Sequence, residues 1–137
     1  MRRLPSILVA LSVLLLAGCA TKTRSDALTT TINAYGSTLR WGDFQSAAQF
    51  IEPSLRAAHP VNALDLARYQ QVRVTEYDNG AGPVPTGDFD VQQTAQISLV
   101  NIHTQSERTI VDHQTWHYDE KTKHWWLTSG LPDITQN

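Results

Sequence analysis

Cysteine is almost absent from this chain of 137 residues, which contains Cys19 and no other. A single cysteine cannot form a disulfide within the chain, so packing has to stabilise the fold. The short motifs of several enzyme classes are also absent: a nucleophile elbow, a phosphate-cradling glycine loop, a CxxC pair and an HExxH helix. We therefore expect no catalytic residues of these classes.

Positive charge is sparse and scattered. The chain has 11 lysines and arginines against 13 acidic residues, for a formal net charge of −2. Without Arg2 and Arg3 the net charge becomes about −4, and no basic cluster remains. Because nucleic-acid affinity depends on clustered positive charge, we expect no nucleic-acid partner.

Long apolar runs are missing as well. The run from Ile7 to Ala17 follows Arg2 and Arg3 and is too short to span a bilayer. Two basic residues before a short apolar run are typical of a cleavable signal peptide. We therefore expect this N-terminal segment to be removed.

The end of this run, Leu16-Ala17-Gly18-Cys19, resembles the lipobox of bacterial lipoproteins. The resemblance implies cleavage between Gly18 and Cys19, a diacylglycerol group on the Cys19 sulfur and an acyl chain such as palmitate on the new amino terminus. Several acyl chains anchor a protein firmly, since each buried methylene contributes about 0.8 kcal/mol. Ala20, rather than an aspartate, follows the cysteine, which implies the periplasmic face of the outer membrane of a Gram-negative bacterium.

The part that remains after cleavage has 119 residues, enough for one compact domain. Residues 19–25 are short, polar and without periodicity, which predicts a tether behind the lipidated cysteine. We expect a single α+β domain over residues 26–134.

Helical periodicity dominates the first part of this domain. Ser25 and Asp26 can cap a helix that continues to about Arg40. Its apolar stripe is Leu28, Ile32, Tyr35 and Leu39. Gly42 and Asp43 predict a corner, and Phe44, Ala47, Ala48 and Ile51 predict a second helix that stops at Pro53. For residues 54–65 we expect at most a short helical turn.

After Leu66 the period changes to two, which indicates strands. The expected strands are residues 69–77, 89–99, 107–118 and 123–129, with a loop at residues 78–87. The clearest alternation places Phe89, Val91, Ala95, Ile97 and Leu99 on one buried face. Two hairpins in series predict a four-stranded antiparallel meander.

Strand registers are less determined than the strands themselves. A one-residue shift of the turn near Thr104 exchanges Ile110 and Val111 as the core residue of the third strand, and both alternatives stay open. For the last hairpin, a turn centred on Lys121 predicts Trp116 opposite Trp126 and His117 opposite Trp125.

Two amphipathic helices packed on a curved meander resemble the NTF2-like and cystatin-like group of folds. The resemblance is carried by Tyr35, residues 39–44, Phe50 and the terminal hairpin 116–127. It implies a bent sheet wrapped around the long helix as a cone that often holds a small molecule. The candidate cavity lining is Tyr35, Leu39, Phe50, Ile97, Leu99, Trp116 and Trp126.

Catalysis in such a cone would need Tyr35 beside an inward carboxylate. Asp90 falls on the wet face of its strand, and Asp112 points inward in one of the two open registers. His113 and His117 lie about 13 Å apart along a strand, too far to share one metal ion. His117 and His124 fall on opposite faces in the favoured register, so we expect no metal site and no catalytic residue.

These patterns predict a lipid-anchored periplasmic protein with a non-catalytic domain that binds a small apolar ligand or an envelope protein. One alternative is an interaction subunit of an envelope or secretion assembly, which predicts a closed cone and an exposed apolar or β-edge patch. The other alternative is an enzyme that uses an open cavity around Tyr35.

Overall fold

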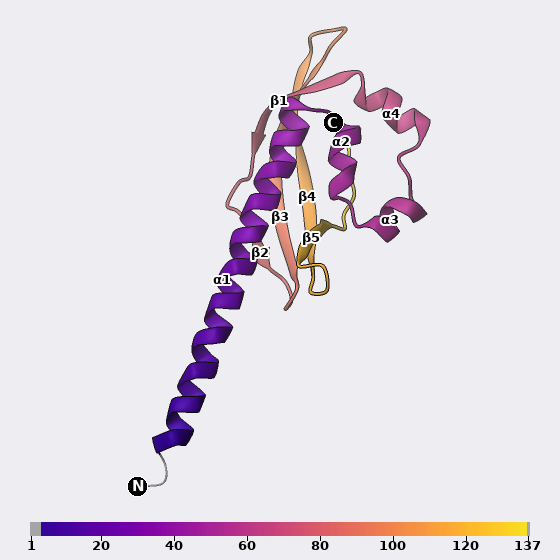
Figure 1. Cartoon of the computed structure of the whole chain (residues 1–137). Helices are drawn as coiled ribbons and strands as arrows, with labels where there is room; N and C mark the ends of the chain where they lie inside the picture. Colours follow the sequence, from indigo (N-terminus) through magenta and orange to yellow (C-terminus); the bar gives the residue numbers. More distant parts are fainter. Residues whose placement is uncertain (1–3, 137) are drawn as a thin grey trace.

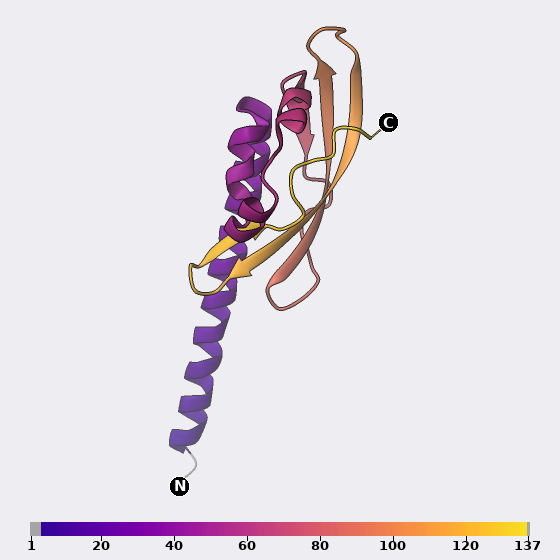
Figure 2. The same ribbon diagram turned by 90° about the vertical axis from the view of Figure 1, so that its right-hand side faces the viewer.

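The computed structural model describes residues 4–136, and the side chains of residues 18–136. Arg2 and Arg3 of the expected signal peptide lie outside the described residues. The fold is α+β: a curled antiparallel sheet forms a half-barrel, and a long N-terminal helix crosses its concave side (Figure 1). Figure 2 shows the short helices packed beside the long one on the same side of the sheet.

The long helix, α1, spans Leu4–Trp41. Its predicted stripe is correct, since all four of its residues are buried: Leu28, Ile32, Tyr35 and Leu39. The expected start at Ser25 and Asp26 is wrong, because α1 is continuous through residues 20–24. That segment contains neither proline nor glycine, and the Thr23 hydroxyl donates to the Cys19 carbonyl one turn earlier, at 3.0 Å.

The corner after α1 forms as expected. The Gly42 amide donates to the Thr38 carbonyl at 2.9 Å, and the Asp43 carboxylate caps the next helix by accepting from the Ser46 amide at 2.6 Å. That helix, α2, spans Phe44–Ala47 and continues as the 3-10 turn η1, Ala48–Phe50.

Two further helices replace the short turn expected in residues 54–65. Pro53 begins α3, Pro53–Ala58, because Glu52 supplies the capping carboxylate. Asn62 likewise caps α4, Ala63–Tyr69, by accepting from the Asp65 amide at 2.9 Å. Proline is well tolerated in a first helical turn, where its missing N–H would have no partner.

The sheet has the strand order β1-β3-β4-β5, and the two-residue β2 pairs with β3 beside β1. Its strands are β1 Val72–Asp78, β2 Val84–Pro85, β3 Asp90–Asn101, β4 Glu107–Asp119 and β5 His124–Leu127. All four expected strands are present and antiparallel. Tyr69, expected in the first of them, ends α4 instead.

The concave faces of β3 and β4 follow strict alternation. In β3 the buried residues include Val91, Ala95, Ile97 and Leu99, as predicted. In β4 the observed register buries Ile110 and leaves Val111 exposed, which decides between the two open alternatives. Even-numbered residues of β4 therefore face the helices.

The register predicted for the last hairpin is wrong by one residue. Trp116 lies opposite Leu127, His117 opposite Trp126 and Tyr118 opposite Trp125. The turn has four residues rather than three, because the Asp119 carboxylate accepts from the Lys121 amide at 2.9 Å and Lys123 takes a positive φ of 55°.

Candidate functional site

The expected lipidation site lies on the exposed surface of α1. Gly18 and Cys19 are both exposed, within a helix that continues into the domain. The side chains of Leu16 and Ala17 lie outside the described residues. Among the described residues, no helix is long and apolar enough to cross a membrane.

The sheet contacts α1 at Arg24, five residues after Cys19. The Trp125 indole donates to the Arg24 carbonyl at 3.0 Å. The Arg24 guanidinium lies over the rings of Phe89 and Tyr118, 5.3 and 5.5 Å from their centroids. Arg24 is therefore part of the folded body, and the expected tether, residues 19–25, is helical.

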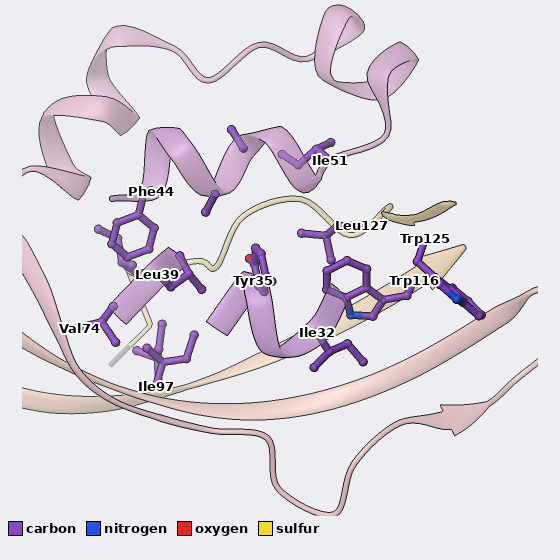
Figure 3. Close-up of a cluster of buried hydrophobic side chains, with 14 of the residues drawn as sticks. Ile32, Tyr35, Leu39, Phe44, Ile51, Val74, Ile97, Trp116, Trp125 and Leu127 are labelled. Atoms are coloured by element: carbon purple, nitrogen blue, oxygen red, sulfur yellow. The ribbon is translucent and has the colours of Figure 1, made fainter. Parts of the chain in front are cut away.

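Side chains fill the space between the half-barrel and its helices. The ring of the fully buried Tyr35 contacts those of Phe50 and Trp116 edge-on, both at 5.4 Å. Figure 3 shows Tyr35 next to Trp116 in this core. Five of the seven candidate lining residues lie in this core: Tyr35, Leu39, Ile97, Leu99 and Trp116. Phe50 packs at its border.

The seventh candidate, Trp126, does not line the core. The corrected register turns Trp125 and Leu127 inward and places Trp126 on the convex face, where its ring lies 4.1 Å from that of His124. Trp125 is therefore the inward residue of this hairpin that the sequence reasoning missed. It was missed because the turn before it is one residue longer than the turn centred on Lys121 that the sequence suggested.

A buried polar group lies on the concave face of β4. Asp112 points inward, and the Gln114 side-chain amide donates to its carboxylate at 2.8 Å and to the Tyr77 hydroxyl at 2.7 Å. The Trp116 indole donates to the Gln114 carbonyl oxygen at 3.1 Å. Burial raises the pKa of Asp112, while the hydrogen bond from Gln114 and the neighbouring His113 act in the opposite direction.

Tyr35 occupies this interior with its hydroxyl unpaired. Its phenolic oxygen has no hydrogen-bond partner among the described residues. Burial raises the pKa of Tyr35 well above its ordinary value, and the charge of Asp112 raises it further. The inward tyrosine and carboxylate that catalysis would need are both present, but Tyr35 is fully enclosed and Asp112 is only 6% exposed.

The histidines of the sheet lie mainly on its convex face. His117 contacts Asp90 at 2.8 Å, and His113 contacts the Thr94 hydroxyl at 3.2 Å. His117 and His124 share this face, so the prediction that they point to opposite faces is wrong. Among the described residues, the His, Cys, Asp and Glu side chains form no group of three or more that could hold a metal ion.

Apolar surface is exposed at the end of the domain where α1 terminates. Trp41 is 78% exposed and carries the Arg40 guanidinium over its ring, and Leu64 is 60% exposed. A cleft of about 260 Å³ lies nearby, and we call it the distal cleft; Gly42, which follows Trp41 in the chain, and Leu66 of α4 contribute to its walls. Its apolar lining is Leu39, Phe44, Leu66, Tyr69, Val72 and Val74.

The sequence reasoning did not single out this region. Trp41 lies two residues beyond Leu39, which turns it about 200° away from the buried stripe of α1. This offset was a usable signal that Trp41 points to solvent. Leu64 gave no such signal, since its helix was not expected.

No family model, curated protein or solved structure matches this chain.

Proposed function

We propose that this chain is a bacterial lipoprotein, anchored through Cys19 at the periplasmic face of the outer membrane, whose NTF2-like domain binds an envelope protein without catalysis. The anchor rests on the sequence Leu16-Ala17-Gly18-Cys19 and on the apolar run before it. The NTF2-like assignment rests on the helix enclosed by a curled antiparallel sheet.

One observation carries the choice of a protein partner over an internal ligand. Tyr35 is fully buried between the concave side of the sheet and the helices, and its ring packs edge-on against those of Phe50 and Trp116. A ligand-binding pocket normally covers most of a small molecule while remaining open to it. The closed interior therefore favours binding at the surface.

The distal cleft is the part of the surface that fits such a role. Trp41, a large and exposed aromatic side chain, directly precedes Gly42 of the cleft wall, and aromatic residues are enriched at the energetically important centres of protein interfaces. A second candidate function is the binding of a small apolar ligand in the same cleft, because its volume of about 260 Å³ approaches that of known small-molecule sites.

The anchor is tested with Cys19→Ser and metabolic labelling by an alkyne fatty acid. We expect label on the wild-type protein and none on the variant, together with loss of membrane retention and of processing. Ser25→Ala, which keeps Cys19, is the matched control. Labelling and membrane retention of Cys19→Ser equal to those of the wild type would refute the anchor.

Partner binding is tested by photocrosslinking from position 41 in living cells. We expect a discrete crosslinked species that disappears when Leu64 is changed to Asp beside the distal cleft. Val84 is equally exposed but lies on β2, so Val84→Asp is the control and should leave the species unchanged. A species that survives Leu64→Asp, or that is lost equally in both variants, would contradict binding at this cleft.

A further inference from the structure

We propose that the mature protein stands directly on the membrane, with the turn between β4 and β5 and the segment before β3 resting on phospholipid headgroups. This inference rests on the proposed anchor at Cys19 and adds the orientation of the domain and the surface that touches the lipid.

The first support is the rigid connection between the anchor and the domain. α1 runs without interruption through Cys19, and Arg24 is held by Trp125, Phe89 and Tyr118. Arg24 lies five positions after Cys19 on the helix, which corresponds to about 7.5 Å along the axis. The lipid is therefore attached within about two helical turns of the folded body.

The second support is what lies at the same end. Tyr118 contacts Arg24, and β4 continues past it by one residue into the turn of residues 120–123. Phe89, whose ring also lies beside Arg24 and whose carbonyl accepts from the Tyr118 amide at 2.8 Å, directly precedes β3. Figures 1 and 2 both show these turns directed toward the N-terminal part of α1. A membrane at Cys19 therefore faces both of them.

The third support is the distribution of lysine. The sequence contains three lysines, Lys22, Lys121 and Lys123, and all of them are exposed at this end of the domain. An ammonium on a long flexible chain can reach headgroup phosphates while its methylenes cover apolar surface.

Acidic residues at this end offset the lysines. Asp88, Asp90, Asp119 and Glu120 lie there, and the hydrogen bonds from the Thr122 hydroxyl and the Lys121 amide lower the pKa of Asp119 and so keep its carboxylate charged. With Lys22, Arg24, Lys121 and Lys123 the formal charge of this end is about zero, while the mature chain as a whole is negative.

The same geometry directs the distal cleft away from the membrane. Trp41 lies 22 positions after Cys19 on the helix, which corresponds to about 33 Å along its axis. Ile102, in the turn between β3 and β4, lies at this far end too, since its amide donates to the carbonyl of Gln71, just before β1. A partner would then meet the cleft well above the bilayer.

The test uses the acylated mature protein, labelled with ¹⁵N and reconstituted in phosphatidylglycerol-containing nanodiscs with a gadolinium chelate on some headgroups. We expect strong paramagnetic broadening of the amide signals of Gly87, Lys121 and Lys123. The signals of Leu64 and Ile102 should keep their intensity. Equal broadening at both ends, or stronger broadening at Leu64 and Ile102, would overturn the proposed orientation.

Two variants sharpen this test. Inserting six Gly and Ser residues between Ala20 and Thr21 converts the helical connection into a flexible one and should abolish the contrast between the two ends. Lys121→Glu should weaken the broadening at Gly87, whereas Arg73→Glu, an equal reversal of an exposed charge on β1, should not. A contrast unchanged by the insertion would overturn the rigid connection.

A second sample separates this inference from the anchor itself. Residues 19–137 coupled through Cys19 to a maleimide phospholipid carry a membrane attachment whether or not the cell acylates the protein. If mass spectrometry finds the cellular protein unacylated, the proposed anchor fails. The broadening pattern of the coupled protein still decides the orientation, with the same two outcomes.

Discussion

Replacing Tyr35 by phenylalanine tests whether the cone is a filled core. The Tyr35 hydroxyl is buried without a hydrogen-bond partner among the described residues. Leaving such a group unsatisfied costs about 1–3 kcal/mol of folding free energy. Its removal recovers part of this cost, and the small void left behind offsets the rest. We therefore expect Tyr35→Phe to gain about 1 kcal/mol in the free energy of unfolding.

Tyr77→Phe is the matched control, because the Tyr77 hydroxyl accepts a hydrogen bond from Gln114 at 2.7 Å. Its loss should cost about 0.5–1.5 kcal/mol, so the two variants should change in opposite directions. For a domain of this size, 1 kcal/mol corresponds to a shift of about 4 °C in Tm.

The assay is urea unfolding followed by tryptophan fluorescence, with Trp116 beside Tyr35 as reporter, and thermal unfolding followed by circular dichroism. All proteins carry Cys19→Ser, which removes the lipid. A loss of about 1 kcal/mol or more in Tyr35→Phe would refute the reasoning. The hydroxyl would then have a partner in the cone, as a ligand-binding or catalytic cavity requires.

Three other substitutions test separate parts of the structure. Ile97→Ala removes a fully buried side chain from β3 and should cost about 2–5 kcal/mol in urea unfolding; a change near zero would contradict its place in the core. Asp112→Asn removes a buried carboxyl whose folded-state pKa is raised above 3.8, so the wild type loses stability as pH rises above that value; the variant's advantage should grow between pH 4 and pH 7, and a constant difference would contradict it. Trp125→Phe removes the hydrogen bond to Arg24 and should cost about 0.5–1.5 kcal/mol and speed amide hydrogen exchange in residues 24–28, whereas unchanged exchange would show that Trp125 does not hold α1.

Periodicity was sufficient wherever one face of an element is buried and the other is wet. The stripe from Leu28 to Leu39 and the alternation from Val91 to Leu99 were predicted residue by residue. In both elements the apolar side chains mark the face that is buried in the core, so their spacing predicts that face directly.

The predicted helix boundaries are wrong where a possible capping residue and the helix propensity of its neighbours favour different boundaries. Ser25 and Asp26 can cap a helix, but they do not start one here, since α1 already includes the residues before them. Pro53 was interpreted as a stop, although a proline in a first turn equally permits a start when Glu52 supplies the cap.

The register of the last hairpin depends on turn chemistry that periodicity does not record. The Asp119 carboxylate accepts hydrogen bonds from the Lys121 amide and the Thr122 hydroxyl, and the positive φ of Lys123 accommodates one more residue in the loop. One extra residue exchanges Trp125 and Trp126 between the two faces of the sheet. For this reason Trp126 was wrongly included in the candidate lining. The hydrogen bond from the Trp125 indole to the Arg24 carbonyl was missed for the same reason.

Mass spectrometry of the protein purified from membranes tests the central claim most directly, because the proposed function and the orientation both begin at Cys19. We predict an amino-terminal peptide that starts at Cys19 and carries a thioether-linked diacylglycerol and an amide-linked acyl chain. A peptide that still contains residues 1–18, or an unmodified Cys19, would contradict the account.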